Sequence, residues 1–148
     1  MVPSPTDPCP CGRLAPARPG GSKGPGAAKL PYAQCCGRYL DPQGADAPLA
    51  PDAESLMRSR YTAFVCERSD YLQATWHAST RPAALDFEAG AKWLGLDVRS
   101  HRATDADHAV VEFVARYRVG GRAVRLHETS RFVRVDERWL YVDGDLSA

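Results

Sequence analysis

The stretch HAVVEFVARYRVGGRAVRLHETSRFVRVDERWLYVD, residues 108–143, decides the fold of this chain. Apolar and polar residues alternate along its two long runs, which is the period of a β-strand with one covered face. Gly120 and Gly121 tolerate the positive φ angles of a two-residue hairpin loop, and Asp136-Glu137 can form the second loop. A short alternation also precedes this stretch. Antiparallel strands are therefore expected over residues 94–98, 108–119, 122–135 and 138–143.

Two helices are expected before these strands. Asp52 is a plausible N-cap, and apolar residues then recur at three- and four-residue spacing to about Glu67, which predicts an amphipathic helix. Ser69 can cap a second, shorter helix that carries Trp76. Helices followed by an antiparallel meander predict an α+β domain over residues 51–148, with the helices on one face of the sheet.

The first 50 residues have a different composition. They contain ten of the 12 prolines and seven of the 12 glycines, but two of the 13 aromatic residues. The segment 13–30, RLAPARPGGSKGPGAAKL, lacks hydrophobic periodicity and cannot offset its ordering entropy, so we expect a flexible insertion there. The sequence thus predicts a small module over residues 1–45 and the main core in residues 51–148.

Four of the five cysteines lie in this N-terminal part, at Cys9, Cys11, Cys35 and Cys36. Four thiolates close a tetrahedral structural zinc site without an open position for water. Disulfides are the alternative, but the cysteine count is odd, and a bridge between neighbours such as Cys35 and Cys36 is strained. The sequence therefore predicts one structural Zn²⁺ on these four cysteines. Cys66 is interpreted as a small buried hydrophobic residue.

Several motifs carry a resemblance to known proteins. The segments CPCG (9–12) and YAQCCGRY (32–39) together resemble the SEC-C motif, a small zinc-binding module. The rest of the chain is similar to the bacterial YchJ-like family. The segments that carry this likeness are ESLMRSRYTAF (54–64), TWHASTRP (75–82), WLGL (93–96), VEFVARY (111–117) and LHETSRF (126–132).

The resemblance implies a SEC-C zinc module joined to a cone-shaped domain similar to nuclear transport factor 2. It also implies a protein partner for the zinc module, since similar modules mediate protein contacts at the tail of the preprotein translocase motor. The insertion between Cys11 and Cys35 is longer than the motif usually has. Loop closure grows with the logarithm of length and costs on the order of 1 kcal/mol here, so we expect the zinc site to survive it.

The hairpin register predicts which side chains share the covered face of the sheet. Counting back from the first loop places Glu128 opposite Phe113, with Ser130 on the same face, and the second loop places Asp143 opposite Ser130. A carboxylate pair in an apolar cup can hold a polar ligand or act in acid–base chemistry. The candidate pocket residues are Arg58, Arg60, Tyr61, Trp76, His77, Trp93, Phe113, Glu128, Ser130 and Asp143.

Structural roles compete with functional ones in this pocket. A buried ion pair with Arg58 or Arg60 of the first helix would also explain Glu128. His77 follows the second helix, where a histidine is more often a capping donor than a base. An open cavity reached by Glu128 or Asp143 would favour an enzyme, whereas a carboxylate held by arginine would favour a binding protein.

Charge and hydropathy bear on two classes of partner. The net charge of +1 provides no field that gathers nucleic acid, so nucleic acid is not the default partner. No apolar run approaches the ~18 residues of a membrane helix, so a soluble cytoplasmic protein is expected. The first hypothesis is a cytoplasmic zinc-binding adaptor, or a ligand- or protein-binding module, with a structural metal. The alternative is a small isomerase or hydrolase that uses Glu128 or Asp143 as acid–base groups, with His77 assisting.

Overall fold

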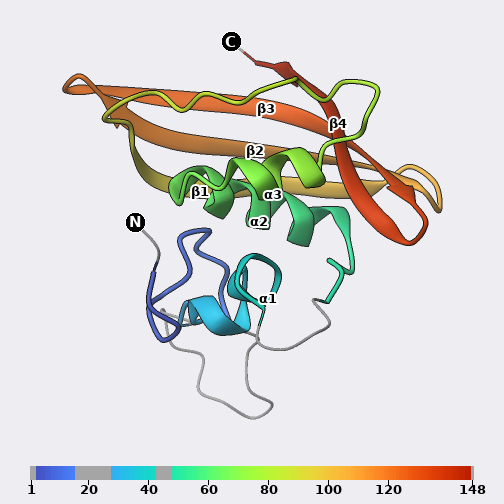
Figure 1. Ribbon diagram of the computed structural model, residues 1–148, viewed down its shortest axis with the longest axis horizontal. Coiled ribbons are helices and arrows are strands. Elements are labelled where there is room, and N and C mark those ends of the chain that lie inside the picture. The colour runs from blue at the N-terminus through green and yellow to red at the C-terminus, as the bar shows by residue number, and fades with distance from the viewer. Residues whose placement is uncertain (1–2, 16–27, 43–47, 148) are drawn as a thin grey trace.

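An antiparallel sheet covered on one face by two helices forms the larger part of the molecule (Figure 1). The computed structural model describes residues 3–15, 28–42 and 48–147. The strands, in spatial as in chain order, are β1 (Lys92–Ala103), β2 (His108–Val119), β3 (Arg122–Val135) and β4 (Arg138–Leu146). The covering helices are α2 (Ala53–Val65) and α3 (Ser69–Ala74). The predicted α+β class and the meander are confirmed.

Strand β1 is more than twice as long as the strand predicted over residues 94–98. Its pairing with β2 shifts register between Trp93 and Gly95, and again between Val98 and Ser100. Such irregularities break the strict alternation of side chains between the two faces. The two ends of β1 therefore show no alternation of apolar and polar residues in the sequence.

The register of the β2–β3 hairpin is the one that the sequence predicts, with Phe113 opposite Glu128. In the β3–β4 hairpin, Phe132 pairs with Tyr141 as expected. Asp136-Glu137 forms the connecting loop, and both residues adopt positive φ angles, 50° and 67°. This conformation belongs to a type I′ turn, which matches the twist of the two strands.

A bulge in the β3–β4 pair corrects one predicted position. The register shifts between Arg131 and Phe132, because β4 contains one extra residue there. Gly144 is therefore opposite Ser130, where the sequence predicted Asp143. Asp143 pairs with Arg131 and accepts a hydrogen bond from its Nε at 2.5 Å. The assignment of Asp143 to the pocket is therefore wrong, since it lies on the outer face of the sheet.

The N-terminal module packs against α2 on the side opposite the sheet (Figure 1). Its described helices are the 3₁₀ turn η1 (Tyr32–Gln34) and the short α1 (Gly37–Leu40). Buried residues of the module and of the sheet belong to one continuous hydrophobic cluster, which extends from Cys9 to Phe132. The boundary between a module over 1–45 and a domain over 51–148 stays a prediction.

Helix α2 is confirmed, but its burial extends beyond the single apolar stripe of the predicted amphipathic helix. Nine of its 13 residues are buried, including Ser55, Ser59 and Thr62. These small polar residues find partners inside the protein; Ser59 Oγ, for example, donates to the carbonyl of Leu56 and contacts the hydroxyl of Tyr71. Layers on both sides of α2 explain why its polar positions are buried as well as its apolar ones.

The predicted flexible insertion over 13–30 is ordered at both ends. Leu14 and Lys29 form an antiparallel bridge, with hydrogen bonds from Ala15 N to Ala28 O and from Leu30 N to Arg13 O, both 2.8 Å. Residues 16–27 lie outside the described part of the chain. Among the described residues, no helix has the length and apolar character needed to cross a membrane.

Candidate metal centre and ligand pocket

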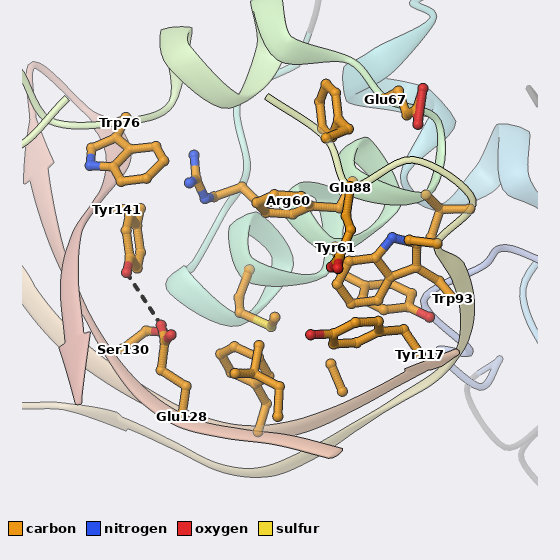
Figure 2. A pocket seen from close by; sticks show the side chains of 18 of the residues that line it. Arg60, Tyr61, Glu67, Trp76, Glu88, Trp93, Tyr117, Glu128, Ser130 and Tyr141 are labelled. Atoms are coloured by element: carbon orange, nitrogen blue, oxygen red, sulfur yellow. Dashed lines mark hydrogen bonds between the residues drawn. The ribbon is translucent and has the colours of Figure 1, made fainter. Parts of the chain in front are cut away.

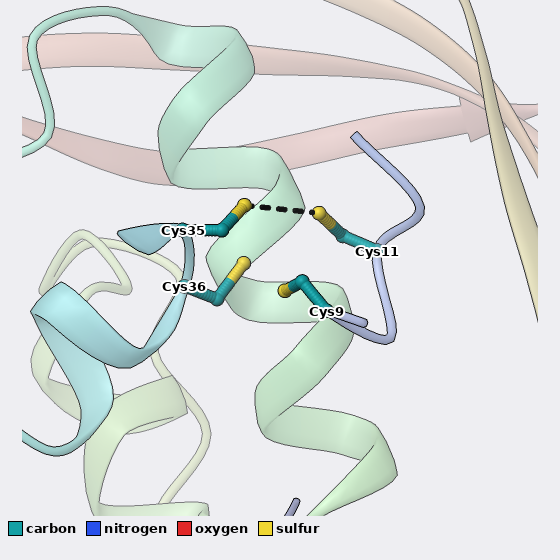
Figure 3. Close-up of side chains that lie close together, drawn as sticks. All are labelled: Cys9, Cys11, Cys35 and Cys36. Atoms are coloured by element: carbon teal, nitrogen blue, oxygen red, sulfur yellow. Dashed lines mark hydrogen bonds between the residues drawn. The ribbon is translucent and has the colours of Figure 1, made fainter. Parts of the chain in front are cut away.

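The four N-terminal cysteines point their sulfur atoms toward one another (Figure 3). Cys9 and Cys11 come from a turn in which Gly12 N donates to Cys9 O at 3.0 Å, and Cys35 and Cys36 lie between η1 and α1. The residue after this pair must be glycine, because a Cβ on Gly37 would lie 2.6 Å from the carbonyl oxygen of Tyr32.

The geometry of this cluster fits a metal ion with four thiolate ligands. The four Sγ atoms lie within 4.8 Å of one another, and Cys11 Sγ is 3.5 Å from Cys35 Sγ. Sulfur atoms on a tetrahedral ion with bonds of about 2.3 Å are spaced about 3.8 Å apart, whereas a disulfide needs about 2.05 Å. Each cysteine is at most 2% exposed, so the site is closed to water.

The thiols also interact electrostatically. Hydrogen bonding with Cys11 lowers the pKa of Cys9 and of Cys35. The same contacts raise the pKa of Cys11, mainly through Cys35, and the pKa of Cys36, mainly through Cys11. The four thiols are therefore coupled in their ionisation, and a bound cation would favour the thiolate form of all four.

Three side chains of α2 hold this module in place. Thr62 Oγ1 lies 3.8 Å from Cys9 Sγ, and Ser55 Oγ accepts a hydrogen bond from Arg13 at 2.8 Å. Arg58 donates to the carbonyl oxygen of Cys11 at 3.2 Å and to Glu54 at 2.8 Å. Arg58 therefore contacts the cysteine cluster, and its predicted place in the pocket is wrong.

The fifth cysteine, Cys66, is the C-cap residue of α2 and lies outside the four-cysteine cluster. The sequence predicts a buried residue, but the structure places Cys66 at intermediate exposure. Partial burial still raises the pKa of its thiol.

A cavity of about 370 Å³ lies between the helices and the covered face of the sheet (Figure 2). It is within the size range of small-molecule sites, and its walls are largely aromatic and apolar. The predicted pocket residues found in its wall are Arg60, Tyr61, Trp76, Trp93, Phe113, Glu128 and Ser130.

The histidine of the prediction, His77, does not line this cavity. Its backbone N–H donates to Tyr141 O at 2.8 Å, and its ring nitrogen Nδ1 lies 2.7 Å from Ser79 Oγ and accepts from Ser79 N. His77 therefore organises the turn after α3, and the same backbone pairing brings the neighbouring Trp76 beside Tyr141, at a ring-centroid distance of 5.1 Å.

Glu128 reaches the cavity from β3, and its carboxylate accepts hydrogen bonds from two hydroxyl groups. Ser130 Oγ donates to Oε2, and Tyr141 OH donates to the same oxygen at 3.3 Å. Gly144 provides the room, since a Cβ there would lie 2.5 Å from Glu128 Oε2. The bulge that removes Asp143 from the pocket is thus also what allows Glu128 to lie across β4.

The predicted ion pair between Glu128 and an arginine is not found among the described residues, none of whose Lys or Arg nitrogens lies within 4.0 Å of this carboxylate. Arg60 instead donates through Nη1 to Leu72 O at 2.8 Å and to Thr75 Oγ1 at 2.7 Å. Burial lowers the pKa of Arg60 to about 10, which leaves it charged at neutral pH.

The guanidinium of Arg60 also lies over two aromatic rings, 5.0 Å from the centroid of Trp76 and 4.6 Å from that of Tyr141. Tyr141 therefore contacts both charged groups. Its ring packs against the guanidinium of Arg60, and its hydroxyl donates a hydrogen bond to Glu128. Burial is the main cause that raises the pKa of Tyr141, with the Glu128 charge second, so the phenol keeps its proton.

An aromatic cluster forms the other end of the cavity (Figure 2). Trp93 of β1 contacts Tyr61 of α2 and Tyr117 of β2, at centroid distances of 5.5 and 4.9 Å. Phe64 and Phe87 extend the cluster from the helix and from the segment before β1.

The family model described as "YchJ, middle NTF2-like domain" matches residues 52–144. The chain is also 65% identical to a UPF0225 protein of Polaromonas naphthalenivorans over 140 residues, which cover 95% of this chain and 98% of the relative. A UPF0225 protein of Bordetella pertussis is 50% identical and covers 99% of each chain. The chain belongs to the YchJ-like family.

Two solved structures share this YchJ-like architecture. A SEC-C motif containing protein from Psychrobacter arcticus has a TM-score of 0.72 and 30% identity, over 97% of this chain and 85% of that chain. A SEC-C motif containing protein from Rhodopseudomonas palustris has a TM-score of 0.69 and 29% identity, over 82% and 95%. The expected SEC-C module and domain similar to nuclear transport factor 2 are therefore confirmed.

Sequence reasoning missed several wall residues of this YchJ-like pocket. Tyr141 was within reach, because the predicted register already placed it on the covered face beside Phe132. The predicted register likewise placed Tyr117 on the covered face. Asp86, Phe87 and Glu88 come from an irregular segment, for which periodicity predicts no direction.

Proposed function

We propose that this YchJ-like chain is a binding protein, in which a structural zinc site supports a domain that holds a small organic molecule. The cavity of about 370 Å³ is the observation that supports this proposal. Its wall is largely aromatic and apolar and includes the carboxylate of Glu128. Apolar walls with a few convergent polar groups are typical of ligand sites.

Zinc is the proposed metal. Four buried cysteines whose Sγ atoms lie within 4.8 Å of one another suit a tetrahedral zinc ion, and four protein ligands leave no open position for a catalytic water. In a reducing cytoplasm, where we place the protein, the thiols stay available for the ion. A protein partner of the module would bind its outer side, where Ala33, Gln34 and Arg38 are exposed, since α2 occupies the inner side.

Purified protein should contain one zinc ion per chain with all four cysteines reduced. The closed cluster has room for one ion, and its sulfur spacing is too long for a disulfide. Elemental analysis gives the stoichiometry, and mass spectrometry after thiol alkylation gives the redox state. Absence of zinc, or a Cys9–Cys35 disulfide, would contradict the site.

A thermal-shift screen against a metabolite library tests the pocket. A ligand at about 100 times its Kd stabilises the native state by about 2.7 kcal/mol, which raises the Tm by on the order of 5 °C or more. Ala115→Leu, which fills the cavity wall, should abolish the shift, whereas Ala123→Leu on the exposed outer side should retain it. A screen in which no compound raises the Tm would refute the proposal.

An enzyme remains the second candidate, because the cavity is open and Glu128 is not locked on an arginine. Glu128 would act as the acid–base group, with the hydroxyls of Ser130 and Tyr141 positioned on its carboxylate. Binding is favoured over catalysis because Asp143 and His77, the other expected participants, lie outside the cavity wall. Turnover of a screened ligand, lost in Glu128→Gln, would support the enzyme.

A further inference from the structure

The charges that line the pocket are unbalanced. The ionisable acidic and basic groups in its wall are Arg60 on one side and Glu67, Asp86, Glu88 and Glu128 on the other. Glu67, Asp86 and Glu88 are exposed, so they form the solvent side of the cavity and attract cations toward it. The cavity therefore favours a positively charged occupant.

The single cation of the wall is already engaged. Arg60 is 6% exposed, bonds to Leu72 O and Thr75 Oγ1, and lies over the rings of Trp76 and Tyr141. These contacts connect α2 to α3, to the residues that follow α3 and to β4. An anionic ligand placed beside Arg60 would also meet the field of Glu128, so the wall offers no favourable place for a carboxylate or phosphate.

Glu128, by contrast, keeps acceptor capacity for a ligand. Both hydroxyl donors, Ser130 and Tyr141, bond to Oε2, and within the described part of the chain no hydrogen bond to Oε1 is found. A partly buried carboxylate without a cationic partner is costly, and a ligand that brings a positive N–H donor removes this cost.

The aromatic cluster suits the rest of such a ligand. Tyr61, Trp93 and Tyr117 present ring surface to the cavity at the end away from Glu128 (Figure 2). Aromatic faces bind both apolar groups and cations. The wall therefore matches a molecule with an apolar body and an ammonium group.

We infer, building on the proposed function, that the ligand is an organic amine whose ammonium group donates to Glu128 Oε1 and whose apolar body lies against Trp93 and Tyr61. Gly144 acts as a positioning residue in this site, because only a residue without a Cβ leaves Glu128 in its place.

Three probes of similar shape test the charge of the ligand: 3-phenylpropylamine, 3-phenylpropanol and 3-phenylpropionate. In calorimetric titrations of the intact zinc-loaded protein, the amine should bind on the order of tenfold or more tightly than the alcohol, and the acid should bind weakest. Equal or tighter binding of the acid would overturn the inference.

The metabolite screen separates this inference from the proposed function. If the hits carry no amino group, the amine inference is overturned but the proposed small-molecule pocket stands. This holds even if none of the three probes binds. A screen without any hit would remove both.

Variants test the role of Glu128 directly. Glu128→Gln keeps an acceptor of the same size but removes the charge, so the preference for the amine over the alcohol should fall to about equal binding. Gly144→Ala should have the same effect by displacing the Glu128 side chain from Cγ outward, with little change in Tm, since this side chain is flexible and no backbone atom is among the three nearest. Glu112→Gln is the control, because this carboxylate pairs with His127 away from the cavity wall. An unchanged amine preference in both Glu128→Gln and Gly144→Ala would overturn the inference.

Discussion

Replacing Cys35 by serine should release the metal and lower the Tm of the chain by on the order of 10 °C. Loss of the ion frees the module from α2 and from Arg68, which donates to Leu40 O at 3.2 Å. Four hydrogen bonds of about 1 kcal/mol each then break, roughly 4 kcal/mol in total. In a chain of this size 1 kcal/mol corresponds to about 2–4 °C. Zinc analysis and thermal melting measure the two effects.

Cys66→Ser is the matched control for this change. It makes the same substitution at a cysteine outside the cluster, so zinc content should remain at one ion per chain and the Tm should change little. In Cys35→Ser the domain over 51–148 should stay folded, because the uncovered face of α2 carries Ser55, Arg58 and Thr62, which tolerate water. Retention of zinc by Cys35→Ser would exclude Cys35 as a ligand, and complete unfolding would contradict the predicted domain boundary.

Arg60→Ala should destabilise the protein by about 3 kcal/mol, which lowers the Tm by roughly 6–12 °C. The substitution removes two hydrogen bonds from a charged donor, worth about 1.5–3 kcal/mol each, and two cation–π contacts. Relief of the cost of burying the charge offsets part of this loss. Zinc content should not change.

Arg58→Ala serves as the comparison, since Arg58 lies two residues away on the same helix but contacts the metal module. It should lower the Tm less than Arg60→Ala does, because its pair with Glu54 is a partly exposed i,i+4 interaction of about 0.3–0.5 kcal/mol. It should instead speed the loss of zinc to a chelator, because its bond to Cys11 O is gone. A larger Tm loss in Arg58→Ala would contradict the assigned roles of the two arginines.

The hairpins illustrate how far local patterns predict this protein. Alternation and the Gly120-Gly121 loop fix the pairing of Phe113 with Glu128, because a one-residue slip would turn every apolar side chain to the other face. The same reasoning fails at Asp143, since an extra residue in β4 has no signature in the residue pattern. The site prediction is therefore right for Glu128, which lines the cavity, and wrong for Asp143.

Helix α2 shows the corresponding limit for helices. Its spacing identifies the helix and the face toward the sheet, on which Met57, Arg60 and Tyr61 line the cavity. The opposite face carries serine and threonine, and the N-terminal module covers them. The period of a sequence reports the faces of one helix, not which other segment lies against them.

The sequence by itself determined the helices and strands of the larger domain in outline, the central hairpin register and the identity of the four clustered cysteines, because these follow from short-range periodicity, turn chemistry and ligand count. Only the tertiary structure decided the roles of the charged residues. Arg58 and Arg60 differ by two positions on one helix and so point to opposite layers, one to the metal module and the other to the pocket. The hairpin register places Glu128 on the covered face, but its side chain has room there only because the bulge in β4 brings Gly144 opposite Ser130. Such roles are set by contacts across layers, and no local pattern specifies them.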